Sequence, residues 1–339
     1  MCRDRALAPA PWLGYGDRED AHVAYQLKSN EPVAKGLRRV VRKELRSAMK
    51  HLDDPHPSTE SVHEARKSIK KVRAVLNLVG RTIDARGARK LLRRASRSLS
   101  PLRDAEVAVA GAKTLCTQDE VVGLTHSCQV LVEAVQRNAE QAWTAALRDR
   151  SGKRAVAALR KVRRAASHWH WKAVRRSVLA SAVQRSYRLA RRGMDATRTG
   201  DPSSAFHEWR KQVKSLWYAL RLLEHRARIP GRVLTDLEHV ETWLGHEHDL
   251  WVLRGLIATC RLPVPDSAGL TAAAEQRQRE LRQRALALGS ELFGTSRPTP
   301  MRVRPPQRAQ RSTPRTPPPE PVRSPRTPPR AREGRKTAG

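Results

Sequence analysis

The apolar side chains between residues 62 and 79 recur at intervals of three or four residues, and those between 206 and 223 follow the same rhythm. This spacing places them on one face of an α-helix, because a helix completes a turn in about 3.6 residues. Each window therefore predicts a helix with a narrow apolar seam. The first seam consists of Val62, Ala65, Ile69, Val72, Leu76 and Val79, and the second of Phe206, Trp209, Val213, Leu216, Leu220 and Leu223.

A row of basic side chains runs beside each seam. Seven of the eighteen positions from 62 to 79 are identical to the residues 144 positions later. Most of these identities are polar, and folding alone would not require them, so the repeat carries chemistry as well as architecture. The first row consists of His63, Arg66, Lys70 and Arg73 with Lys67 at its outer edge, and the second of His207, Arg210, Lys214 and Arg221.

Two further blocks repeat at an offset of 145 residues. Residues 99–107 match 244–252, and residues 42–49, which include Arg42 and Arg46, match 187–194, which include Arg188 and Arg191. Three matched blocks predict a duplicated helical unit of about 140 residues. Two such units normally pack about a pseudo-twofold axis, which would bring the two cationic rows towards a shared groove.

The same periodicity predicts an all-α chain from residue 20 to about residue 293, with repeat 1 at about 20–150 and repeat 2 at about 165–293. Residues 1–19 read as an irregular lead. From 294 to 339 the chain is rich in Pro and Arg and cannot bury enough apolar surface to fold, which predicts a disordered basic tail. Alternating strand patterns are not evident.

The net charge of the chain limits the kinds of molecule that it is expected to bind. The 339 residues carry a formal charge of +34, of which the tail contributes +10 and the body about +24. A body with this imbalance repels itself and should be stabilised by a polyanion. Four widely spaced cysteines and the absence of a secretory signal or a membrane span favour a cytoplasmic protein.

The two rows begin close to predicted helix starts, with Thr59 and Ser203 as the expected N-caps. His63 and His207 therefore fall near the first helical turn, where free N–H groups and the helix dipole favour an anion. A charged imidazole is unfavourable there unless an anion is bound. We expect both histidines to take up protons when an anion binds.

These motifs resemble the CHAD domain family, a class of α-helical domains named for their histidines. The resemblance rests on Val62-His63-x-x-Arg66-Lys67-x-x-Lys70-x-x-Arg73 and Phe206-His207-x-x-Arg210-Lys211-x-x-Lys214, with the Arg103-Asp104 pair and Tyr187-Arg188-x-x-Arg191 in support. It implies two pseudo-twofold-related four-helix bundles that bind inorganic polyphosphate around a central groove.

The resemblance implies that the phosphates are contacted by His63, Arg66, Lys67, Lys70, Arg73, His207, Arg210, Lys211 and Lys214, and also by Arg188 and Arg191. The second basic row and the upstream matched block add Arg221, Arg42 and Arg46. The two copies are not equivalent, because Trp217 stands where the first copy has Arg73 and His248 replaces the Arg of the Arg-Asp pair. We expect the two halves to bind unequally.

Other functions have less support. The run His246-Glu247-His248-Asp249 predicts no metal site, since neighbours two apart do not share a helix face. We find no Glu-x-Glu-x-Lys motif of a triphosphatase barrel and no phosphate-binding P-loop. We therefore expect no cofactor, no metal and no enzymatic activity.

The sequence thus predicts a protein that binds polyphosphate and associates with polyphosphate granules where these form. The alternative is a nucleic-acid-binding or nucleoid-associated protein that uses its basic tail, since electrostatics alone does not separate the two. Oligomeric state stays open.

Overall fold

The computed structural model describes residues 25–54, 58–117, 119–227, 229–259, 262 and 264–294. Contacts divide the chain into residues 1–304 and 305–339, and every described residue belongs to the first unit. The predicted lead at 1–19 and the predicted tail beyond residue 294 lie outside the described residues.

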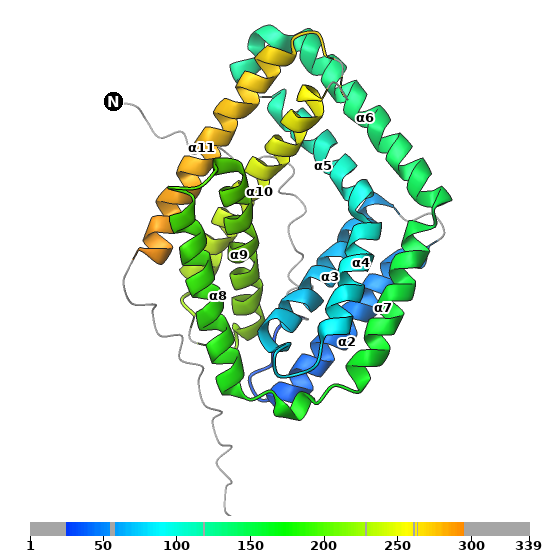
Figure 1. Ribbon diagram of the computed structural model, residues 1–339, viewed down its shortest axis with the longest axis vertical. Helices are drawn as coiled ribbons and strands as arrows, with labels where there is room; N and C mark the ends of the chain where they lie inside the picture. The colour runs from blue at the N-terminus through cyan, green and yellow to red at the C-terminus, as the bar shows by residue number, and fades with distance from the viewer. Residues whose placement is uncertain are drawn as a thin grey trace, which may run out of the picture. The chain divides into compact units, whose positions relative to one another are not determined.

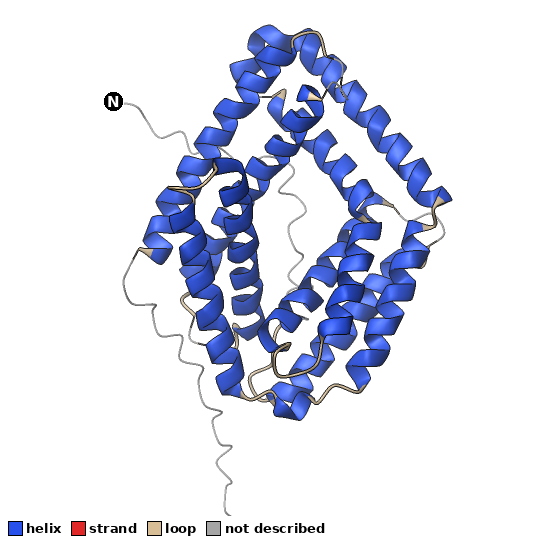
Figure 2. Cartoon of the chain, in the orientation of Figure 1, coloured by secondary structure: helices blue, strands red, loops and turns tan. Residues whose placement is uncertain are grey.

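The described part of the chain is helical, without an extended strand, which confirms the predicted all-α class (Figure 2). Two short 3-10 helices, η2 (Asp119–Leu124) and η3 (Trp171–Ala173), lie between longer α-helices. The α-helices are α2 (Val33–Leu52), α3 (Thr59–Val79), α4 (Arg86–Ser98), α5 (Ser100–Leu115), α6 (Thr125–Arg148), α7 (Ser151–Ser167), α8 (Arg176–Ala196), α9 (Pro202–Leu223), α10 (Gly231–Ala258) and α11 (Ser267–Phe293).

These helices form two groups of four (Figure 1). In the first group α2 packs on α3 and α7, and α4 packs on α7 and α3; in the second, α9 packs between α8 and α10, and α10 packs on α11. The pair α5 and α6 leaves the first group and packs against the end of the second, where α5 meets α10. The two groups are consistent with the expected pair of bundles.

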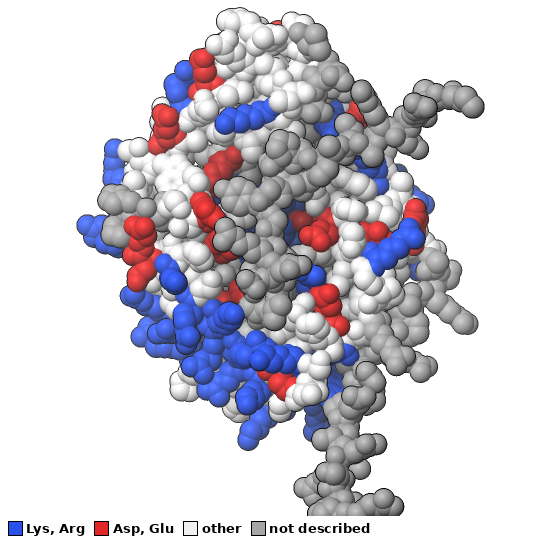
Figure 3. Space-filling view, turned by 180° about the vertical axis from the view of Figure 1, so that it is seen from behind, with Lys and Arg blue, Asp and Glu red and all other residues white. Residues whose placement is uncertain are grey.

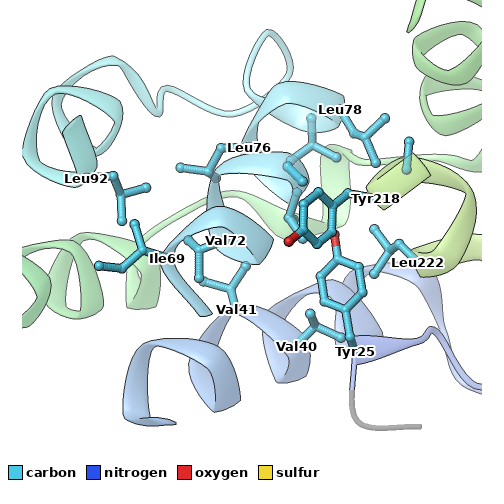
Figure 4. Packing of buried hydrophobic residues seen from close by; sticks show 14 of the residues in the cluster. Tyr25, Val40, Val41, Ile69, Val72, Leu76, Leu78, Leu92, Tyr218 and Leu222 are labelled. Atoms are coloured by element: carbon cyan, nitrogen blue, oxygen red, sulfur yellow. The ribbon is translucent and has the colours of Figure 1, made fainter. Parts of the chain in front are cut away.

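Both predicted apolar seams lie in the core. Every residue of the seam on α3 is at most 1% exposed, and every residue of the seam on α9 is at most 4% exposed, which confirms the predicted helical phase. Figure 4 shows the seam on α3 packed between Val40 and Val41 of α2 and Leu92 of α4, with Tyr218 of α9 beside it. The burial of the seams fixes how α3 and α9 are rotated, and with them the basic rows.

Among the described residues the repeat extends to whole helices, with one break. At offsets of 144 or 145 residues α8 matches α2, α9 matches α3, and α11 matches α6, while the single helix α10 spans the positions of α4 and α5 together. The break between α4 and α5 lies at Leu99, and Pro101 in the first turn of α5 lacks the N–H that would continue the hydrogen bonds of α4 into α5. The matching residue of α10 is His246, which continues the helix. The positions that would match α7, about 295–312, lie outside the described residues.

The expected N-caps were wrong by one or two residues. The side chain of Ser58, rather than Thr59, accepts a hydrogen bond from the Ser61 N–H at the start of α3. At the start of α9 the side chain of Asp201 accepts from the Ser204 N–H. Ser and Asp both cap helices well, and spacing alone does not decide which of several nearby candidates becomes the N-cap.

Gly289 and Gly111 differ in their surroundings, because the first is closely packed and the second is not. A Cβ on Gly289 of α11 would lie 2.8 Å from a ring carbon of the fully buried Trp209, whereas a Cβ on Gly111 of α5 would meet nothing within 4 Å. We expect Gly289→Ala to lower the free energy of unfolding by about 1–3 kcal/mol through overpacking. Gly111→Ala should raise it by about 0.5–1 kcal/mol by favouring the helix. Urea unfolding of both variants checks this pair, and a neutral Gly289→Ala would contradict the packing of α11 on Trp209.

Candidate functional site

Four helices from the two halves of the chain meet around the basic rows. Helix α3 contacts α9 and α5, while α10 contacts α9 and α5, so the four helices surround one region. Helices α3 and α9 carry the repeated basic motif, and α5 and α10 carry the repeated block that contains Asp104 and Asp249. The duplication therefore supplies both pairs of walls.

Lys70 of α3 and Lys214 of α9 lie at the centre of this region. Burial lowers the pKa of Lys70 well below its ordinary value, and the neighbouring charge of Lys214 lowers it further. Helices α3 and α9 contact each other, and the two lysines lie close enough for the charge of one to act on the other. Lys214 donates to Glu241 of α10, with both side chains mostly buried.

Glu241 is the carboxylate of this centre. Burial alone would raise its pKa. The charges of Lys214, Arg210 and Lys70 outweigh that penalty and hold the pKa of Glu241 at about 2. Glu241 is therefore ionised at neutral pH and offsets part of the repulsion between the two lysines.

Two arginines extend the basic region towards α5. Arg66 of α3 donates to the carbonyl of Ser96 at 3.1 Å, and burial together with the charge of Arg103 lowers its pKa to about 10. Arg103 of α5 lies 3.3 Å from a carboxylate oxygen of Asp249 on α10. Asp249 and the nearby Asp104 thus orient an arginine.

Glu106 adds little counter-charge to these arginines at neutral pH. Burial raises the pKa of its carboxyl to about 7, although Arg66 and Arg103 act to lower it. One of its carboxylate oxygens is buried and accepts no hydrogen bond within the described structure. The carboxyl is therefore partly protonated at neutral pH, which leaves the charge of the two arginines less compensated.

Arg210 of α9 acts on several groups of the α10 wall. Its charge lowers the pKa of both Glu241 and His248. A Cβ on Gly245 would lie 3.6 Å from the Arg210 guanidinium, an ordinary contact distance, so this group lies close to α10. Neither Arg210 nor Lys70 forms an ion pair within the part of the chain that the structure describes.

A pair of histidines lies beside Arg210. The Nδ1 atoms of His207 and His248 are 3.2 Å apart, and the His248 ring stacks on Trp251 at 5.7 Å between centroids. Burial and the neighbouring His207 lower the pKa of His248 to about 3, and burial also lowers the pKa of His207. On α3, His63 reaches the surface but is partly desolvated, and this desolvation together with the charge of Lys70 lowers its pKa. The histidines are therefore mainly neutral at pH 7 before any anion binds.

The remaining members of the two rows lie at the margins. Lys67 is 3.6 Å from Glu64, and burial lowers its pKa to about 8. Lys211 lies 3.0 Å from Glu208, with both side chains exposed. Arg73 is exposed, and its pKa is lowered by burial and by Arg93 of α4.

Arg221 lies at the far end of α9. It is 3.2 Å from Glu224 and lies over the ring of Trp217 at 5.6 Å. Trp217 itself packs edge-on against Tyr218. The second row therefore ends in an aromatic and ion-paired cluster where the first row ends in an exposed arginine.

The predicted arginines of the upstream blocks lie on other helices. Arg42 and Arg46 are on the exposed face of α2, Arg188 is exposed on α8, and Arg191 is half-buried on α8. The charges that most strongly affect Lys70 and Glu241 come instead from α3, α5, α9 and α10. The sequence repeat groups these arginines with the basic rows, whereas the structure places them on α2 and α8.

Sequence reasoning missed Glu241, and it did not assign Arg103, His248 or Asp249 to the binding site although its motifs contain them. Arg103, His248 and Asp249 lie in the matched block of α5 and α10, and that block could have identified them as walls of the site. Glu241 lies outside every matched block, so no local signal marked it. The sequence windows contained only Glu64 and Glu208 as acids, and α10 supplies the stronger counter-ions.

No group of three or more His, Cys, Asp or Glu side chains among the described residues is arranged to hold a metal ion. In the same residues, no helix has the length and apolar character needed to cross a membrane.

Comparison with known proteins agrees with this architecture. The CHAD domain family matches residues 39–258, which is more than half of the chain. The chain belongs to this family. A search of curated protein sequences found no match.

Two solved structures share the fold. The CHAD domain from the plant Ricinus communis is 15% identical, with a TM-score of 0.54 over 80% of this chain and 95% of that chain. PptA from Streptomyces chartreusis is 16% identical, with a TM-score of 0.57 over 78% of this chain and 98% of that chain. At these identities the likeness concerns the fold.

Glu241→Gln should destabilise the protein, because it leaves Lys214 and Lys70 facing each other without their carboxylate. The expected loss in the free energy of unfolding at pH 7 is roughly 2–4 kcal/mol. The folded pKa of about 2 lies below the ordinary value of 4.5, so Glu241 stabilises fully above pH 4.5. This stabilisation disappears as the pH falls towards 2.

Urea unfolding at pH 7, 4 and 3 measures this effect, with Glu238→Gln on the exposed face of α10 as the matched control. The difference between the two variants should shrink with decreasing pH. Equal stability of the two variants at pH 7 would show that Glu241 is not the counter-ion of the rows.

Proposed function

We propose that this protein binds inorganic polyphosphate, without turnover, in the region between α3, α5, α9 and α10. The observation that supports this most is the approach of Lys70 to Lys214, with Arg66, Arg103 and Arg210 around them. Like charges held together in a partly desolvated site repel, and a chain of phosphates relieves that repulsion.

The arrangement suits a linear polyanion better than a single small anion. The basic groups follow α3 from Arg66 to Arg73 and α9 from His207 to Lys214, which at about 1.5 Å per residue is some 10 Å along each helix. Arginine can bind phosphate oxygens through two donors, and lysine adds a mobile charge. Successive phosphates could therefore be bound by successive helical turns.

Binding without catalysis is part of the proposal. The carboxylates of the site, Glu241 and Asp249, are each engaged by a basic side chain. Because they are engaged in this way, these carboxylates adjust the charge of the site and do not act on a substrate. We further propose a cytoplasmic protein that associates with polyphosphate granules where these form.

The central test is the combined variant Lys70→Ala and Lys214→Ala in the full chain. Each charge-assisted hydrogen bond to phosphate contributes about 1.5–3 kcal/mol, so polyphosphate affinity should fall by at least about tenfold. The matched control is Lys113→Ala with Lys172→Ala, two exposed lysines on α5 and η3. Fluorescence anisotropy with labelled polyphosphate measures the affinity, and circular dichroism measures the helical content.

Lys214→Ala also removes the partner of Glu241, so Lys70→Gln alone is the second variant. It leaves the Lys214–Glu241 pair in place and relieves repulsion. It should weaken polyphosphate binding without loss of stability. Full affinity in a folded Lys70→Gln protein, or equal losses in the double variant and its control, would refute the proposed site.

Polyphosphate affinity should rise as the pH falls from 7.5 to 5.5. The pKa values of His63 and His207 are lowered in the free protein, and a bound polyanion would raise them. A group whose pKa is higher in the complex takes up a proton on binding, so acid favours the complex. Titrations at three pH values measure the slope, and it should flatten in the combined His63→Gln and His207→Gln variant. An unchanged slope in that variant would exclude the histidines as the proton acceptors.

A further inference from the structure

The outward face of α2 carries only cations. Its inward face buries Leu37, Val40, Leu45 and further apolar residues, and its single acid, Glu44, is buried with them. The lysines and arginines take the opposite side of the helix. Those exposed are Lys35, Arg38, Arg42, Lys43, Arg46 and Lys50.

Helix α7 lies beside α2 and continues this surface. It contains six basic residues and no acid, and its apolar side packs against α2 and α4. All six are exposed: Lys153, Arg154, Arg160, Lys161, Arg163 and Arg164. Seen from behind, Lys and Arg gather in one broad patch at the lower left, over this part of the molecule (Figure 3). We call the exposed cations of α2 and α7 the outer basic face.

Few carboxylates balance the outer basic face. Arg160 lies 3.9 Å from Asp53 and Arg154 lies 3.8 Å from Asp149, both at its margin. Within the described structure, the exposed cations of α2 form no ion pair. Adjacent helices that display a single sign of charge repel, and a bound polyanion would remove that cost.

The dimensions of this face fit two phosphate strands better than one. A helix of 20 residues is about 30 Å long, and two packed helices with their side chains present a surface about 20 Å wide. Duplex nucleic acid is about as wide, and about 30 Å of its length carries some 18 phosphates on two strands. The outer basic face is a two-dimensional array, whereas the rows on α3 and α9 are half-buried lines.

The composition of the face also bears on its partner. The exposed large apolar side chains of the described residues are Leu147, Leu189 and Trp251, which lie on α6, α8 and α10. Neither α2 nor α7 presents an aromatic ring on which unpaired bases could stack, or an apolar residue that could enter a lipid layer. Backbone phosphates of a duplex require only cations.

We propose that the outer basic face binds the phosphate backbone of double-stranded nucleic acid without sequence specificity, separately from the polyphosphate site. Arg42 and Arg46, predicted from the sequence as polyphosphate ligands, lie on this face. The proposal does not depend on the proposed function, because none of its residues belongs to α3, α5, α9 or α10.

The test uses the full chain and replaces four exposed cations by glutamine, which keeps helix propensity. The face variant is Lys35→Gln, Arg38→Gln, Arg163→Gln and Arg164→Gln. The control variant carries the same change of charge on α5, α8, α11 and the turn after α8: Lys113→Gln, Arg192→Gln, Arg198→Gln and Arg284→Gln. The tail is present in both, so its contribution cancels.

Binding of a 20-base-pair duplex of mixed sequence is measured between 50 and 300 mM salt. The face variant should lose about tenfold or more in affinity at 150 mM, and its slope of log affinity against log salt should fall by about 2–4. The control should change by less than half as much. Affinity for a short polyphosphate should be unchanged in the face variant.

Three results would overturn the proposal. Equal losses in the two variants would show that duplex binding is spread over the whole chain. Loss of binding to vesicles of anionic phospholipid, with duplex affinity retained, would assign the face to a membrane surface. Loss of polyphosphate affinity alone would make it part of the polyphosphate site. Failure of the Lys70 and Lys214 variants to affect polyphosphate would refute the proposed function and leave this result standing.

Discussion

Repulsion between the cations of α3 and α9 is the constraint around which the centre of this protein is built. The two seams must be buried for the core to form, and their burial turns Lys70 towards Lys214 at the contact between the helices. Like charges this close, and partly removed from water, cost free energy that the fold has to offset. Glu241 and Asp249 on α10 provide that offset within the chain, through Lys214 and Arg103. The compensation is incomplete, because Lys70 and Arg210 have no ion-pair partner within the described residues and Glu106 is partly protonated at neutral pH. The positive charge that is not compensated within the chain is available to bind a polyanion.

The duplication explains why helices of both repeats surround the site, but it does not explain why the two halves of the site differ. The first copy breaks at Leu99 into α4 and α5, whereas α10 continues through His246. The walls also differ in their residues, since the α10 wall carries His248 against His207 and the opposite wall carries Arg103 against Asp249. The far ends of the rows differ as well, with Arg221 over Trp217 on α9 and the exposed Arg73 on α3. The expectation that the halves bind unequally acquires a physical basis, although it is still a prediction.

Two kinds of basic surface follow from one composition. The groups between α3 and α9 are few, half-buried and close to carboxylates, so their strength depends on desolvation and on the protonation of neighbours. The cations of α2 and α7 are numerous, exposed and almost free of carboxylates, so their strength depends on number and on ionic strength. The net charge of the whole chain does not distinguish these two surfaces, whereas the distribution of cations over the helices does.

The sequence by itself determined the all-α class, the helical phase of both seams, the duplication and the membership of Lys70 and Lys214 in matching rows. These are local or periodic properties, and the pattern of side chains along a helix encodes them directly. Tertiary structure alone decided that Glu241 is the counter-ion of Lys214, that His248 lies against His207, and that Arg42 and Arg46 lie on a different surface from Lys70. It also decided that Ser58 and Asp201, rather than their neighbours, cap the two helices. Contacts between residues far apart in the chain depend on how helices pack, and a single sequence does not specify which acid of α10 will meet which cation of α9.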